Sequence, residues 1–129
     1  MTNGEICENA VRLAGETAAS DCPDYAERSE CLLAVICRFL APLDRDIRFA
    51  YGLEEQGTLP DSATPEGTFP LTDELAPAAS FQLASLLTID ENESLSEEMR
   101  SRFAEAIADV RARLPMKNHP IRNAYPGIL

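Results

Sequence analysis

The chain has 129 residues with 22 acidic and 11 basic side chains, so its formal net charge is −11. Apolar residues make up 45% and aromatic residues 6%, which favours one helical domain with a core of Ala and Leu over a β-sandwich. The charge argues against a duplex-binding surface, because each phosphate contact needs a cation. No apolar run approaches the roughly 20 residues of a membrane-spanning helix.

The first segment is predicted to form a helix over residues 3 to 14. Thr2 and Glu5 have the spacing of a capping box, in which each side chain accepts from a backbone N–H at the helix start. A helical stripe of apolar residues follows, namely Ile6, Cys7, Ala10, Val11 and Ala14. Gly15 suits the position after the helix, because glycine adopts a positive φ at little cost.

A second helix is predicted to begin near Asp21 or Asp24 and to form the central core element. Its helical spacing runs through Tyr25, Ser29, Leu32, Leu33, Ile36 and Leu40. The run CLLAVICRFLA is apolar nearly all round, which predicts burial on more than one side. We expect Pro42 to end this helix, because proline lacks the N–H that continues the hydrogen-bond ladder.

Residues 43 to 53 leave two alternatives open. Ile47, Phe49 and Tyr51 alternate as in a short strand, whereas Asp44 could cap a short helix. Residues 56 to 71 contain three prolines and two glycines, which predicts a long irregular loop. A loop of this length in a compact domain is more often functional or mobile than decorative.

A third helix is predicted to start at Thr72 or Asp73. Pro77 then falls in the first turn, where its missing N–H does little harm. The apolar stripe of this helix is Leu75, Ala79, Leu83, Leu86 and Leu87. The additional alanines along it would let a neighbouring helix approach closely.

A fourth helix is predicted after an acidic break. Ser94 and Glu97 have the spacing of a second capping box, and Pro115 ends the segment. Its apolar stripe is Met99, Phe103, Ala106, Ile107, Val110 and Leu114. The opposite face carries acid–arginine pairs at i,i+4 spacing, Glu98 with Arg102 and Asp109 with Arg113.

Residues 116 to 129 are predicted to form an extended C-terminal arm after a helical domain of residues 1 to 115. The arm has no helical period but holds four apolar residues: Ile121, Tyr125, Ile128 and Leu129. Apolar side chains contribute stabilising free energy only when something covers them. Three alternatives follow for the arm: it docks on another subunit, it folds back on its own domain, or it is disordered. With Phe69 and Leu71 of the loop, these four residues are our candidate partner contacts.

No set of residues in the sequence indicates catalysis, a cofactor or a metal site. Cys7, Cys22, Cys31 and Cys37 include no CxxC pair, so core packing is the simpler interpretation. His119 is the only histidine and has no cysteine or acidic cluster beside it in the sequence. The acidic run DENESLSEE lacks the spacing of a calcium loop and fits a solvated helix start.

The run FPLTDELAPAASFQLASLLTIDENESLSEEMRSRFAEAIADVRAR resembles the C-terminal half of small head-to-tail connector (neck adaptor) proteins of tailed bacteriophages. In that group a Leu-Pro or Pro-Leu turn and an acid precede an Ala-rich helix ending in A..L. A short acidic break then leads to a helix with the pattern F..A...AR. The resemblance covers residues 65 to 114, and more loosely residues 3 to 40.

The resemblance implies an all-α antiparallel bundle of about four helices that assembles into a ring between portal and tail. The expected partners are the portal protein, tail-side neck proteins and further copies of the chain, and the subunit alone would be a monomer. DNA would pass through the ring without specific binding, helped by an acidic lumen that repels phosphate. The protein would occur in the virion and, because the first residues show no signal-peptide core, in the host cytoplasm.

A second hypothesis is an acidic helical regulator, similar to an antitoxin, that sequesters a basic protein partner. Such a module would bind through a charged face, so its affinity would fall steeply with salt. Ring assembly through apolar contacts would be far less sensitive to salt.

Overall fold

The apolar periodicity of the sequence produces a helical bundle. The computed structural model describes residues 1–15 and 23–115. These residues form α1 (Asn3–Leu13), α2 (Pro23–Tyr51), α3 (Ala76–Thr88) and α4 (Glu93–Arg113), with a 3-10 turn, η2 (Asp73–Leu75), before α3. They contain no strand, only an isolated bridge between Thr2 and Thr68, so the prediction of an all-α fold is confirmed.

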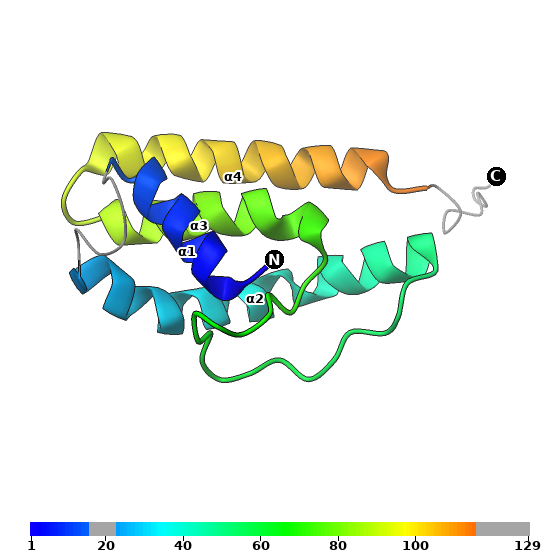
Figure 1. Ribbon diagram of the computed structural model, residues 1–129. Helices are drawn as coiled ribbons and strands as arrows, with labels where there is room; N and C mark the ends of the chain where they lie inside the picture. The colour runs from blue at the N-terminus through cyan, green and yellow to red at the C-terminus, as the bar shows by residue number, and fades with distance from the viewer. Residues whose placement is uncertain (16–22, 116–129) are drawn as a thin grey trace.

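The α3 helix is the centre of the bundle. It packs against α1, α2 and α4, and in Figure 1 it lies between α2 and α4 and runs antiparallel to both. Leu83 and Leu87 are fully buried, and Ala78, Ala79 and Ala84 let the neighbouring helices approach closely. Pro77 lies in the first turn of α3, as predicted.

The α1 helix begins where the sequence predicts. The hydroxyl of Thr2 accepts from Glu5 N–H, and the Glu5 carboxylate accepts from Thr2 N–H at 2.7 Å, which confirms the capping box. Gly15 follows the helix with φ +97°, a conformation that other residues rarely adopt. Ile6, Cys7, Ala10 and Val11 are buried, so the predicted stripe is the core face of α1.

The α2 helix does not end at Pro42; it continues to Tyr51. The proline removes one backbone hydrogen bond, but Leu43 and Ile47 are buried on the same side as Leu40, and this packing holds the helix together. Residues 43 to 51 are therefore helical, and the strand alternative is wrong. Gly52 ends the helix with φ +66° in a Schellman motif, in which Leu53 N–H donates to Arg48 O at 2.8 Å.

The start of α4 differs from the prediction. Its N-cap is Asn92, whose side chain accepts from Leu95 N–H at 3.1 Å, and Ser94 already lies inside the helix. Asn92 precedes Glu93, so the cap forms two residues earlier than the Ser94–Glu97 spacing suggests. Met99 and Val110 are buried against the core, while Phe103 and Ile107 are only partly buried.

The long loop between α2 and α3 is held by backbone contacts to the N-terminus. Asn3 N–H donates to Gly67 O at 2.9 Å, and Gly4 N–H donates to Pro65 O at 3.0 Å. A Cβ at Gly4 would lie 3.0 Å from Pro65 O, so glycine permits the close approach. The loop thus has fixed positions although it forms no regular element.

Candidate interaction surface

The α2 helix has two apolar faces, and only one of them is covered by the rest of the described chain. Leu33, Ile36 and Leu40 are at most 3% exposed and face the core. By contrast, Val35 is 58% exposed and Phe39 is 70% exposed. The expectation that the run CLLAVICRFLA is buried on more than one side is therefore wrong for the described single chain.

The exposed apolar side chains lie on one side of the helix, which we call the outer face of α2. It consists of Cys31, Val35, Phe39, Pro42 and Phe49. Successive residues of an α-helix turn by about 100°, so all five lie within a sector of about 80°. Between Cys31 and Phe49, Asp46 is the one acidic residue in this sector. Exposed apolar patches on a folded protein commonly mark interaction sites.

A groove of about 500 Å³ separates part of this face from α4. Phe39 from α2 and Phe103 from α4 are the two aromatic residues of its lining. Ala104 and Ala108 are one turn apart on α4, and their small side chains leave the space open. The lining of this α2–α4 groove comprises Phe39, Leu40, Pro42, Leu43, Phe103, Ala104, Ile107, Ala108 and Arg111.

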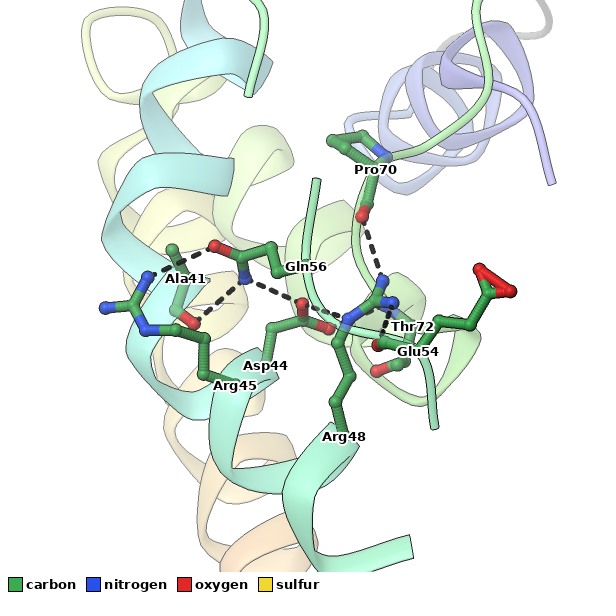
Figure 2. Close-up of polar contacts among 8 residues, drawn as sticks. All are labelled: Ala41, Asp44, Arg45, Arg48, Glu54, Gln56, Pro70 and Thr72. Atoms are coloured by element: carbon green, nitrogen blue, oxygen red, sulfur yellow. Dashed lines mark hydrogen bonds and ion pairs between the residues drawn. The ribbon is translucent and has the colours of Figure 1, made fainter. Parts of the chain in front are cut away.

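Asp44 is the most completely buried acid of the described chain, and its contacts connect α2 to the long loop. Figure 2 shows its carboxylate between the side chains of Gln56 and Arg48. One oxygen accepts from Arg48 Nε and from Gln56 Nε2, both at 2.7 Å, and the other accepts from Thr72 N–H at 2.8 Å. The side chain is fully enclosed, with 0% exposure.

The two side chains that bind Asp44 also bind the backbone around it. Arg48 donates to Glu54 O at 3.0 Å and to Pro70 O at 3.1 Å, at the two ends of the loop. Gln56 donates to Ala41 O at 3.1 Å, an oxygen within α2 beside Pro42. The cluster therefore fastens both ends of the loop to about two turns of α2, from Ala41 to Arg48 (Figure 2).

The chemistry of Asp44 is that of a structural anion. Burial alone would raise the pKa of its carboxyl, but the hydrogen bonds from Gln56, Thr72 N–H and Arg48 outweigh burial and lower the pKa below its ordinary value. Both oxygens already accept hydrogen bonds, and neither is accessible to a substrate. A general base has to reach the proton that it removes, so this arrangement does not suit acid–base catalysis.

The structure describes three of the four cysteines. Cys7 and Cys37 are buried, as the core interpretation predicts, and burial raises the pKa of the Cys7 thiol and raises that of Cys37 to about 12. Cys31 is exposed on the outer face of α2, so core packing is wrong for this residue. Cys22 and His119 lie outside the described residues. Among those described, no three His, Cys, Asp or Glu side chains are grouped as metal ligands.

The candidate contact residues from the sequence have different positions. Phe69 and Leu71 are 3% exposed and pack in the hydrophobic core, so burial within the chain accounts for both and neither presents a free surface. Ile121, Tyr125, Ile128 and Leu129 lie outside the described residues. Sequence reasoning missed Val35, Phe39 and Phe49 as surface residues. The all-round apolar character of CLLAVICRFLA indicates apolar residues on the outer side of α2 but does not tell whether the chain itself covers them.

Within residues 1–15 and 23–115, no helix combines the length and the apolar character that crossing a bilayer requires.

Comparisons of the chain with protein-family models, curated proteins and solved structures found no match.

Proposed function

We propose that the protein is a structural subunit of a phage or prophage neck, which assembles into a ring between portal and tail and continues the DNA channel. The supporting observation is the outer face of α2, an apolar surface on a rigid helix whose large side chains remain more than half exposed in the described chain. Its partners would be neighbouring copies, the portal protein and tail-side neck proteins. The proposal requires docking surfaces and no catalytic group.

The size of the outer face suits an assembly held by several weak contacts. Fully burying a Val or Phe side chain stabilises by about 1.5–3 kcal/mol, so covering the exposed parts of Val35, Phe39 and Phe49 contributes roughly 3–6 kcal/mol in total. Association costs about 4–15 kcal/mol in translational and rotational freedom. One face therefore supports only weak pairing, whereas a closed ring engages each subunit on two sides.

The alternative, an acidic module that sequesters a basic protein, has less support from the surface. On α4 the acids alternate with arginines, and two ion pairs form there: Arg102 with Glu98 at 3.0 Å and Arg113 with Asp109 at 3.5 Å. These pairs neutralise part of the face that a basic partner would have to bind. The remaining negative charge still suits a channel through which DNA slides without adhering.

Co-expression with the portal protein encoded in the same gene cluster tests the proposal. We expect a complex that contains several copies of the chain and appears ring-shaped by electron microscopy. Val35→Ser/Phe49→Ser should abolish the complex, because it removes apolar area from the outer face. Ile89→Ser is the matched control, since Ile89 is also exposed, at 44%, but lies at the end of α3.

Two results would contradict the proposal. One is a gene neighbourhood without portal, capsid or terminase genes. The other is a portal complex that the control and the double variant form equally well.

A further inference from the structure

The C-terminal arm begins beside the α2–α4 groove. The hydroxyl of Tyr51 donates to Arg113 O at 3.2 Å, which holds the last turn of α4 against the end of α2. Arg111, in that same turn, lines the groove. Pro115 follows Arg111 by four residues, about one helical turn. The arm therefore starts at one end of an open apolar channel.

We propose that residues 116–129 of the same chain lie in the α2–α4 groove of the free subunit, with Ile121 and Tyr125 against its apolar lining. The reach is sufficient. Phe103 lies about 15 Å back along α4 from Arg113, and the extended residues 114 and 115 add up to about 7 Å. Six extended residues, from Pro115 to Ile121, span up to roughly 20 Å, which reaches the level of Ile107. Ten extended residues, from Pro115 to Tyr125, span up to roughly 33 Å, so Tyr125 reaches the level of Phe103 with slack.

The apolar residues of the arm match the lining of the groove, and its basic residues have the opposite charge to the rest of the chain. The arm contains Lys117 and Arg122 but no acid, so all 22 acids of the chain lie before it. Attraction between a basic segment and an acidic body favours return of the arm to its own domain, although the one charged residue of the lining, Arg111, is itself basic. The apolar side chains of the arm need a cover, and the groove offers Leu43, Ile107 and the two phenylalanines of its lining.

Phe39 belongs both to the outer face of α2 and to the lining of the groove, so an arm in the groove would cover part of that face. The inference about the arm does not depend on the proposed function, because reach, charge and groove are properties of the single chain.

Site-directed cross-linking in the full-length chain tests the proposal. All four native cysteines are replaced, and the pair Ala104→Cys and Ala124→Cys joins the groove wall to the arm. The control pair is Arg102→Cys with Ala124→Cys. Arg102 lies two residues from Ala104 but lines a different hollow, turned about 160° around α4. Circular dichroism verifies that each variant keeps its helical content.

At low micromolar concentration with a short bis-maleimide, the Ala104→Cys pair should give an intrachain product of monomer mass. Its formation should be at least about tenfold faster than for the control pair, because docking raises the local concentration of the two thiols. Replacing Ile121 and Tyr125 with serine in the same background should remove this advantage. A product of dimer mass would place the arm on a second copy and overturn the proposal. Equal rates for the two pairs would overturn it as well.

Discussion

Asp44→Ala is expected to destabilise the fold by about 3–5 kcal/mol, because it leaves the largely buried guanidinium of Arg48 without its counter-charge. The change also removes the acceptor for Gln56 and for Thr72 N–H. A domain of this size is stable by about 5–15 kcal/mol in total. The loss is therefore a large fraction of the stability and should lower the Tm by about 10–20 °C.

Urea unfolding followed by circular dichroism measures this loss. Asp61→Asn is the matched control, since Asp61 also binds an arginine, Arg38 at 2.6 Å, but is fully exposed. Solvent screens such a pair, so the control should leave the unfolding midpoint almost unchanged. Limited proteolysis should also cut the loop after α2 faster in Asp44→Ala. Equal stabilities for the two variants would refute the assignment of Asp44 as the anchor of the loop.

The same anchor predicts a pH dependence. The folded state lowers the pKa of Asp44, so its stabilising contribution is complete above the ordinary Asp pKa of about 3.9 and is lost as pH falls through the folded-state value. The difference in unfolding free energy between the wild type and Asp44→Asn should therefore be constant near neutral pH. It should shrink below about pH 4. A difference that stays constant at acidic pH would contradict the sign of the shift.

Two further predictions concern single side chains. Asn92→Ala should lower the unfolding free energy by about 1 kcal/mol through loss of the α4 cap, whereas Ser94→Ala should change it little. Urea unfolding measures both values. A larger loss for Ser94→Ala than for Asn92→Ala would show that Ser94 is the N-cap. With Cys22 replaced by serine, Cys31 should react rapidly with a thiol reagent, whereas Cys37 should react only on unfolding, because burial raises its pKa to about 12. Simultaneous modification of both thiols in the folded protein would contradict the burial of Cys37.

The sequence predicts the helices well where local signals and burial agree. The capping box of Thr2 and Glu5 forms as its spacing indicates. The stripe through Leu83 and Leu87 faces the core, where both side chains are fully buried. Gly15 and Pro77 occupy the helix-end positions that their backbone preferences allow.

Local signals fail where tertiary contacts outweigh them. Pro42 is a strong helix breaker, yet α2 continues because Leu43 and Ile47 pack on the core. In addition, the Asp44 carboxylate accepts hydrogen bonds from Gln56 and Thr72 at the two ends of the loop. These contacts join residues that are far apart in the sequence, so no local pattern indicates them. The Ser94–Glu97 spacing was misleading because Asn92, two residues earlier, is an equally good cap.

The candidate surface shows a different limit. A helix with apolar residues on two opposite faces is buried on both faces only if something besides the core covers the outer face. Periodicity gives the directions of Val35, Phe39 and Phe49 around α2, but it does not tell whether the cover is the same chain or a partner. Phe69 and Leu71 present the opposite case, since an irregular loop gives no periodic sign that its apolar residues enter the core.

The salt dependence of the proposed binding to a portal protein tests the central claim most directly, namely that apolar area on the outer face of α2 would hold the proposed assembly. Calorimetric titration of the full-length chain at 0.05 M and 0.5 M NaCl should give dissociation constants within about threefold of each other, because apolar contacts are not screened by ions. A dissociation constant that rises more than about tenfold at the higher salt would show that charge pairing drives binding. The outer face of α2 would then not be the principal contact.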